Sequence, residues 1–241
     1  MRLTKYLLLT LLVLSLIVII LGERITLTPF YDHKGYFKEG VSETRGFLTP
    51  DECQTISRNI QQNSYIGDNP LNEGFENTRG ILFDFEVEDA QELLASRNCN
   101  DLYNIFERIR KPYANRFIMN VLIIDNSTMK PLEEDPDDEM AVEYHYDSTL
   151  DEIPEQYILG LERSYLPECV SVVYVDLPES FEGGELDICS YFYHRDIELV
   201  KPELGMLLEF NGKYMHGVYK MDKVYPKKSK RVSIVLEQYS I

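Results

Sequence analysis

Basic side chains are scarce in this sequence. It has 24 lysines and arginines against 41 aspartates and glutamates, which gives a formal net charge of −17 at pH 7. Such a charge repels nucleic acid and anionic lipid surfaces. We therefore expect no nucleic-acid partner, whereas neutral or basic partners are compatible with the field of the protein.

Cysteine is equally sparse, with four residues at Cys53, Cys99, Cys169 and Cys189. Their spacing matches no zinc motif, which argues against a zinc-finger type of fold. An even number of cysteines permits two disulfides in an oxidising compartment, in one of three connectivities. Four buried thiols are the alternative, and the sequence leaves both open.

Only one long run without charge is present, from Tyr6 to Gly22, and Arg2 and Lys5 precede it. The run is slightly shorter than the roughly 20 residues of a membrane-spanning helix and slightly longer than a signal-peptide core. Cations before the run favour a cytoplasmic N-terminus. We therefore predict a signal-anchor over residues 1–22, in the endoplasmic reticulum or Golgi membrane, with the rest of the chain in the lumen. Cleavage after Gly22 would give a secreted protein, and a buried core helix is the third reading.

The remaining chain has the length and the 44% hydrophobic content of one domain. We expect a stem over residues 23–45 and a domain over 46–241. A helix is predicted to follow Thr49 as N-cap, with Pro50 in its first turn, and further helix is predicted across 88–115. Short stretches rich in valine, isoleucine, tyrosine and phenylalanine follow, at 117–126, 142–148, 170–177, 184–193, 206–212, 216–221 and 231–241. This order predicts an α+β sandwich or jelly-roll barrel with the helices packed on one face.

Two of the four histidines stand two residues before an aspartate, in His145-Tyr-Asp147 and His194-Arg-Asp196. Because acids are abundant, this pattern alone is weak. On a strand, however, residues i and i+2 face the same side, so His145 and Asp147 could act as adjacent metal ligands. His216 lies 71 positions after His145, which leaves room for several strands, but only 22 after His194. The first pair with His216 therefore fits the two-histidine, one-carboxylate triad of non-haem iron sites.

At this point the residues resemble a known family, the 2-oxoglutarate- and Fe(II)-dependent dioxygenases of the prolyl 4-hydroxylase type. The resemblance covers roughly residues 46–241. It rests on the order and spacing of the opening stretch at 48–56, His145-x-Asp147, Phe181-Glu-Gly-Gly-Glu-Leu, Pro202-x-x-Gly205 with Phe210, His216-Gly-Val and Arg231-x-Ser233. It implies a double-stranded β-helix, or jelly-roll barrel, over about residues 117–241. The iron ligands that it implies are His145, Asp147 and His216.

The resemblance also implies a contact for the distal carboxylate of 2-oxoglutarate, made by a basic residue on the last barrel strand. Arg231 matches that position, and Ser233 would add a hydroxyl on the same face of the strand. Arginine suits the task because its planar fork can bind a carboxylate with two hydrogen bonds. The interval from His216 to Arg231 is longer than is usual for the family, with an apparent loop over 221–230, so Lys227, Lys228 and Lys230 are rivals. Tyr174 is a further candidate, although a core role is the simpler reading for one of 17 tyrosines.

The activity implied is hydroxylation of a C–H bond, with a prolyl or lysyl side chain of a protein or peptide as the expected target. Fe(II), 2-oxoglutarate and O2 would take part, with release of succinate and CO2, and ascorbate is the expected reductant. Oxidation of a small molecule or lipid is the nearest alternative. A non-catalytic jelly-roll binding module and a zinc hydrolase are the others; the module predicts a broken triad, and the hydrolase gives no reason for Arg231.

Overall fold

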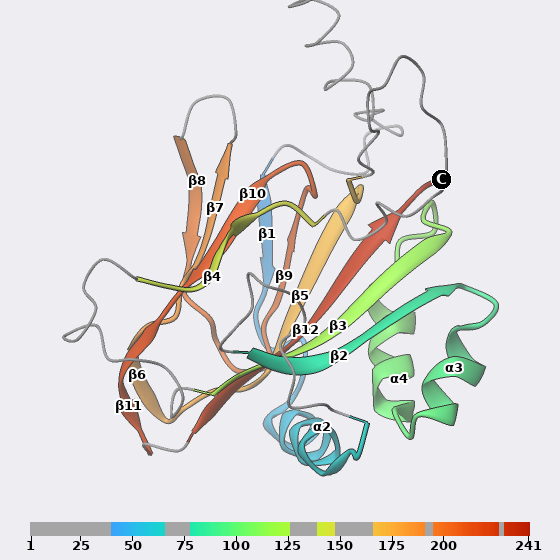
Figure 1. Ribbon diagram of the computed structural model, residues 1–241, viewed down its shortest axis with the longest axis horizontal. Helices are drawn as coiled ribbons and strands as arrows, with labels where there is room; N and C mark the ends of the chain where they lie inside the picture. The colour runs from blue at the N-terminus through green and yellow to red at the C-terminus, as the bar shows by residue number, and fades with distance from the viewer. Residues whose placement is uncertain (1–39, 66–77, 126–138, 148–165, 191–194, 227–228) are drawn as a thin grey trace, which may run out of the picture. The chain divides into compact units, whose positions relative to one another are not determined.

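Two antiparallel β-sheets face each other, and helices cover the outer face of the larger sheet (Figure 1). The computed structural model describes residues 40–65, 78–125, 139–147, 166–190, 195–226 and 229–241. Residues 1–39, with the predicted anchor and most of the predicted stem, lie outside the described residues, as does His194.

The larger sheet has six strands. In spatial order they are β1 (Val41–Thr44), β9 (Leu207–Phe210), β5 (Cys169–Asp176), β12 (Lys230–Tyr239), β3 (Arg116–Asp125) and β2 (Thr78–Glu86). The smaller sheet has β4 (Met140–His145), β10 (Met215–Tyr219), β7 (Leu186–Ser190) and β8 (Arg195–Val200). β6 (Ser180–Gly183) and β11 (Met221–Tyr225) form a separate antiparallel pair.

The chain crosses repeatedly between the two sheets. Between β3 and β12, the strands β3, β5, β9 and β12 lie in the larger sheet, and β4, β7, β8 and β10 lie in the smaller one. Leaving aside the β6–β11 pair, successive strands therefore alternate between the sheets, except that β7 and β8 are neighbours in the smaller sheet. This alternation is the double-stranded β-helix, or jelly roll. The predicted fold class, with helices on one face of the barrel, is therefore confirmed.

Alternation along the strands divides the side chains between two cores. On β12, Val232, Ile234 and Leu236 belong to the core under the helices. Val235 instead packs against the core between the two sheets, together with Tyr174 and Phe210. Because successive strand residues face opposite sides, Arg231, Ser233 and Glu237 share the inner face with Val235.

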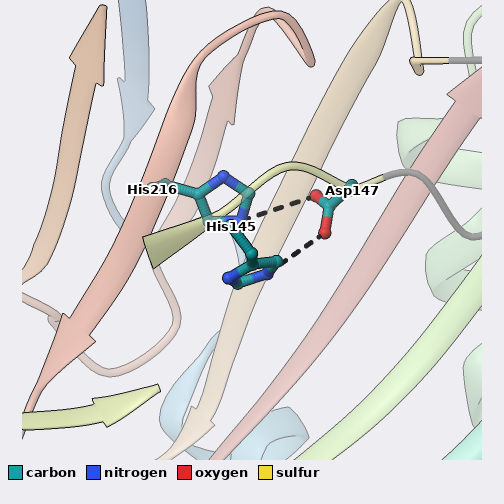
Figure 2. A group of neighbouring side chains, drawn as sticks. All are labelled: His145, Asp147 and His216. Atoms are coloured by element: carbon teal, nitrogen blue, oxygen red, sulfur yellow. Dashed lines mark ion pairs between the residues drawn. The ribbon is translucent and has the colours of Figure 1, made fainter. Parts of the chain in front are cut away.

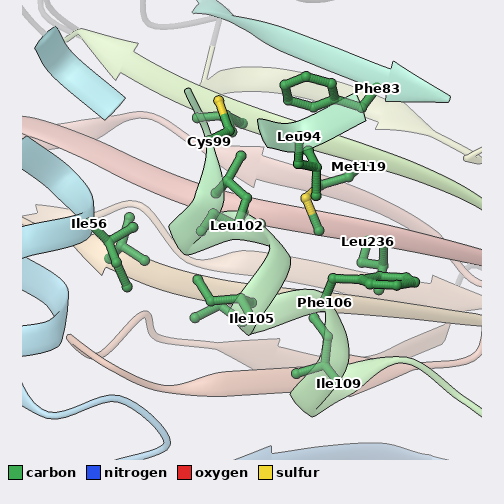
Figure 3. Close-up of a cluster of buried hydrophobic side chains, with 14 of the residues drawn as sticks. Ile56, Phe83, Leu94, Cys99, Leu102, Ile105, Phe106, Ile109, Met119 and Leu236 are labelled. Carbon is green, nitrogen blue, oxygen red and sulfur yellow. The ribbon is translucent and has the colours of Figure 1, made fainter. Parts of the chain in front are cut away.

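Three helices pack on the larger sheet: α2 (Pro50–Gln62), α3 (Ala90–Ser96) and α4 (Asn100–Ile109). Figure 3 shows α4 over the strands, with buried side chains from α2, β2, β3 and β12 around it. The region predicted as helical at 88–115 is thus two helices. Asn98, between them, has φ of 56°, a left-handed conformation that ends the first helix and redirects the chain.

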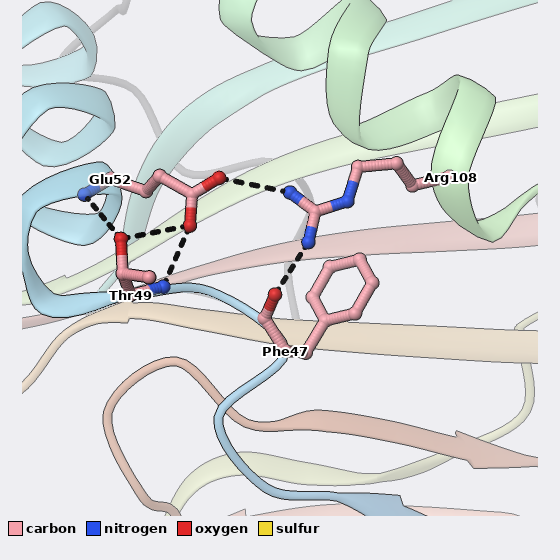
Figure 4. A network of polar contacts seen from close by, with 4 residues as sticks. All are labelled: Phe47, Thr49, Glu52 and Arg108. Carbon is pink, nitrogen blue, oxygen red and sulfur yellow. Dashed lines mark hydrogen bonds and ion pairs between the residues drawn. The ribbon is translucent and has the colours of Figure 1, made fainter.

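The start of α2 is fixed by the predicted cap (Figure 4). The Thr49 hydroxyl accepts a hydrogen bond from the Glu52 backbone N–H at 3.3 Å, and the Glu52 carboxylate accepts one from the Thr49 N–H at 2.7 Å. Arg108 on α4 donates to the same carboxylate at 3.2 Å and to the carbonyl of Phe47 at 2.5 Å. The capping box thereby also joins α2 to α4, and such a cap contributes about 1 kcal/mol.

Two segments expected to be irregular are strands. Val41–Thr44, within the predicted stem, is β1 and pairs along its whole length with β9. Met221–Tyr225, within the predicted loop before Arg231, is β11 and pairs with β6.

The predicted location in a secretory-pathway membrane is contradicted. Within the described ranges, no helix is both long and apolar enough to cross a bilayer. The longest of them, α2, has 13 residues, whereas a span needs roughly 20.

All four cysteines are buried and none of them forms a disulfide, so the disulfide alternative does not hold. Burial raises the pKa of the Cys53 thiol to about 11 and that of Cys169 to about 12. These thiols are therefore protonated at neutral pH and behave as small apolar side chains.

Candidate metal centre

His145, Asp147 and His216 converge at one end of the smaller sheet (Figure 2). The Asp147 carboxylate faces both imidazoles, with Oδ1 3.5 Å from His145 Nε2 and Oδ2 3.5 Å from His216 Nε2. One ligand atom from each residue lies within 4.8 Å of the others. The structure thus brings together the three residues selected from the sequence.

Strand pairing explains this meeting. His145 is the last residue of β4 and is directly opposite His216 on β10. Asp147 follows beyond the end of β4, so the pair is not carried by one continuous strand, as the sequence argument assumed. Gly217, next to His216, allows the close approach, because a Cβ there would lie 2.5 Å from the Met140 methyl group and 3.1 Å from the Val142 carbonyl.

Backbone carbonyls orient both imidazole rings. His145 Nδ1 lies 2.8 Å from the Glu143 carbonyl oxygen, and His216 Nδ1 lies 3.3 Å from the Tyr214 carbonyl oxygen. A carbonyl only accepts, so Nδ1 is the donor and, in a neutral ring, Nε2 carries the lone pair. Both lone pairs then face the carboxylate, an arrangement that is typical of metal-binding histidines.

The electrostatics of Asp147 and His216 favour the forms that bind a cation, whereas those of His145 favour its protonated form. Burial alone would raise the pKa of Asp147, but the neighbouring His216 and His145 outweigh it and hold the pKa below its ordinary value. Burial lowers the pKa of His216 and so favours its neutral form. For His145, burial acts in the same direction, but the hydrogen bond and charge of Asp147 prevail and raise its pKa.

This donor set suits a divalent metal. Two imidazole nitrogens and one carboxylate oxygen match the ligand set of non-haem Fe(II) sites, which leaves further coordination positions open. Asp147 Oδ2 is buried and makes no hydrogen bond in the part of the chain that the structure describes. A metal ion would satisfy that oxygen, so the residues fit the group.

A buried arginine forms the second part of the site. Arg231, near the start of β12, is 1% exposed, and its Nη1 donates to the Gly184 carbonyl at 2.7 Å. Its guanidinium lies over the ring of Tyr174, 5.1 Å from the centroid. Burial lowers the pKa of Arg231, while Tyr174 opposes that change.

Two polar atoms of this pair lack partners among the described residues: Nε of Arg231 and the hydroxyl of Tyr174. Ser233 is also buried and is opposite Tyr174 in the pairing of β12 with β5. Buried polar groups are nearly always hydrogen-bonded, so this corner of the barrel suits an acceptor-bearing anion. A carboxylate would supply the missing acceptors.

Sequence reasoning named Tyr174 as a candidate but preferred a core role for it, and it did not find the carbonyl of Gly184. A tyrosine on an apolar strand carries no signal of its own, whereas the Gly-Gly pair was visible as a turn. Gly183 and Gly184 have φ of 73° and 75°. A Cβ on Gly183 would lie 2.2 Å from the Lys220 carbonyl oxygen, so glycine is required there.

Of the three rival cations, Lys230 is less well placed than Arg231. Lys227 and Lys228 lie outside the described residues. Lys230 is at the first position of β12, opposite Asp125, and is partly exposed. Strand alternation turns it away from the inner face that carries Arg231.

Comparisons with known proteins are informative about the fold. No family model and no curated protein matches the chain. IDO from Bacillus thuringiensis matches 87% of this chain and 98% of its own, at 10% identity and a TM-score of 0.50. A prolyl-4-hydroxylase from Pseudomonas putida matches 85% and 94%, at 15% identity and 0.48. A viral collagen prolyl hydroxylase from Paramecium Bursaria Chlorella virus-1, in a 2OG complex, matches 84% and 97%, at 15% identity and 0.44. The likeness to IDO shows a shared fold.

Proposed function

We propose that this protein is a 2-oxoglutarate- and Fe(II)-dependent dioxygenase that hydroxylates a C–H bond. The observation that carries the proposal is the combination of two features in one barrel. One is the convergent His145, Asp147 and His216 set, and the other is the buried Arg231 with Tyr174, whose polar atoms lack an acceptor. A metal-binding module alone accounts for the first feature and not for the second.

In this proposal the two histidines and the aspartate hold Fe(II). Bound iron with 2-oxoglutarate and O2 supplies the oxidising chemistry, with succinate and CO2 as by-products, and ascorbate is the proposed reductant. The contribution of the chain is to fix the ligands. The Glu143 and Tyr214 carbonyls hold both rings, so the coordinating nitrogens need little reorganisation when the metal binds.

Arg231, Tyr174 and Ser233 would hold the distal carboxylate of 2-oxoglutarate. Arg231 already donates to Gly184, which fixes the position of the guanidinium before the cosubstrate arrives. The Tyr174 hydroxyl would donate a second hydrogen bond to the same anion. Burial removes competing water, which strengthens both interactions.

The substrate that we propose is a prolyl or lysyl side chain of a protein or peptide. The formal charge of −17 is compatible with neutral and basic peptides. A small molecule or a lipid would be oxidised by the same chemistry, so the substrate needs its own test.

The test uses the full-length protein loaded anaerobically with Fe(II), supplied with 2-oxoglutarate and O2, and follows succinate release. We expect succinate to form, and we expect none from His145→Ala, Asp147→Ala or His216→Ala. His194→Ala is the matched control, because it removes the other histidine of the His-x-Asp type. Succinate formation that survives loss of His216 would contradict the proposal. Peptide, small-molecule and lipid panels then show which class accelerates turnover.

A further inference from the structure

A second set of polar side chains, two of them buried, lies on the inner wall of the larger sheet, away from Arg231. Glu237, near the end of β12, has no exposed surface, and Tyr239 is 1% exposed. The Tyr239 hydroxyl donates to Glu237 Oε2, and Asn120 Nδ2 donates to Glu237 Oε1 at 3.1 Å. We call these three residues the acidic wall. A buried carboxylate with aligned donors is costly to build, and neither the metal ligands nor the arginine corner accounts for it.

The strand registers place the acidic wall at the metal end of the barrel. Glu237 is opposite Val170 on β5, and Val170 is opposite Phe210 on β9. The Phe210 ring meets the His216 ring edge-on, with centroids 4.9 Å apart. Two strand pairings and one ring contact thus link Glu237 to His216, the proposed metal ligand.

Arg231 lies at the opposite end of β12, on the same inner face of the larger sheet. It lies six positions before Glu237 on β12, about 20 Å along an extended strand. 2-Oxoglutarate held by Arg231 would reach the metal from one side. The acidic wall would then lie on the other side of the metal, where the substrate would approach. Asn120 is opposite Val235 in the pairing of β3 with β12, so it faces the same interior.

The chemistry of the acidic wall is that of acceptors. Glu237 carries a negative charge when ionised, and the Asn120 amide oxygen is buried with no hydrogen bond from the described residues. Both donors of the cluster that the structure defines are directed at Glu237 itself. Such a surface favours a cationic N–H group, whereas a prolyl ring offers neither a charge nor a side-chain donor.

We propose that Glu237 and Asn120 recognise a cationic amine of the substrate, so that the enzyme acts on lysyl-type rather than prolyl-type side chains. This inference rests on the proposed function, because the metal is what makes this end of the barrel the reacting end. Glu237 is here a specificity-determining residue and takes no part in the oxidation.

The test measures binding of short fluorescent peptides to the full-length protein by anisotropy. The flanking positions are randomised, and the central residue is lysine, arginine, norleucine or proline. Norleucine keeps the length of the lysine side chain without its charge. A charge-assisted hydrogen bond predicts that the lysine peptides bind about tenfold to hundredfold more tightly than the norleucine peptides. The arginine arm, and an alkylamine competitor, distinguish a lysyl side chain from other cations.

Glu237→Gln keeps the size of the side chain and removes its charge, so the lysine-to-norleucine preference should fall toward one. The control is Glu209→Gln on the helix side of the same sheet, where Glu209 pairs with Lys111 at 2.6 Å; the preference should persist there. Equal binding of the two peptides by the unmodified protein, tighter binding of proline, or a preference that survives Glu237→Gln would overturn the inference. If Glu237→Gln fails to fold, the ratio for the unmodified protein decides.

Succinate release, measured in parallel, separates this inference from the proposed function. Lysine preference without succinate supports the acidic wall as a recognition surface and contradicts the oxygenase. Succinate without lysine preference supports the oxygenase and overturns the substrate assignment.

Discussion

Replacement of Tyr174 by phenylalanine should stabilise the free protein and weaken its cosubstrate binding. The Tyr174 hydroxyl is fully buried and has no hydrogen-bond partner within the described residues. A buried hydroxyl without a partner costs about 1–3 kcal/mol. Phenylalanine keeps the ring under the Arg231 guanidinium and removes only the oxygen. Allowing for the small void that remains, we expect a gain of about 1 kcal/mol, or roughly 2–4 °C in Tm for a domain of this size.

The same change should lower the affinity for 2-oxoglutarate. A hydrogen bond to a charged group contributes about 1.5–3 kcal/mol, which corresponds to roughly tenfold to hundredfold in Kd. Calorimetric titration with 2-oxoglutarate under anaerobic conditions, with Fe(II) present, measures this loss. The stabilisation that saturating 2-oxoglutarate gives should shrink in parallel, because it follows the affinity.

Tyr239→Phe is the matched control for stability. Tyr239 is equally buried, but its hydroxyl donates to Glu237, so its loss should lower Tm. Thermal unfolding of the metal-free proteins compares the two substitutions directly. A lower Tm for Tyr174→Phe would refute the reasoning, because it would mean that the hydroxyl already has a stabilising partner in the free protein.

Three further predictions concern the metal ligands, Arg231 and the cap of α2. His145→Ala should remove measurable Fe(II) binding in an anaerobic titration and His194→Ala should keep it; the reverse result would show that the wrong pair was chosen. Arg231→Ala should raise the apparent KM for 2-oxoglutarate at least about tenfold, and Arg231→Lys less, because lysine keeps the charge without the fork; unchanged KM values would refute the carboxylate contact. The hydrogen bond from the Thr49 backbone N–H lowers the pKa of Glu52 from its ordinary value of 4.5. The ionised Glu52 therefore stabilises the folded protein above pH 4.5, and this contribution is lost as the pH falls through the folded-state pKa. The Tm difference between the natural protein and Glu52→Gln should therefore shrink on acidification, and a constant difference would contradict this.

Local chemistry made part of the structure predictable. Thr49, Pro50 and Glu52 lie within four positions of one another, and their capping pattern predicts the start of α2 without reference to any other segment. Most strands of the barrel were visible for the same reason, but β8 was not among the predicted strands. His145 and His216 were separable from His194 because chain intervals limit which strands can be neighbours.

The features that sequence reasoning missed depend on pairing between distant strands. Tyr174 was only a secondary candidate in the sequence, because its proposed role depends on its position opposite Ser233, and that register includes a shift between Val232 and Ser233. Alternation of apolar residues fixes which face a residue takes, but not the register of one strand against another. Thr78–Glu86 was not among the predicted strands either, although there a local signal exists, because the buried Phe83 and Phe85 alternate with exposed residues.

The position of β4 at the margin of its sheet has a consequence for the exchange of a bound metal. Among the described strands, β4 is hydrogen-bonded to β10 alone, whereas β10 lies between β4 and β7. Separation of β4 from β10 breaks a single ladder, yet it displaces both His145 and the adjoining Asp147. Two of the three proposed ligands could thus leave through a local opening that spares the rest of the barrel. The opening of β4 should then limit the rate of metal release, and amide hydrogen exchange in β4 measures that opening. Stronger pairing of β4 with β10 should slow both exchange and metal release.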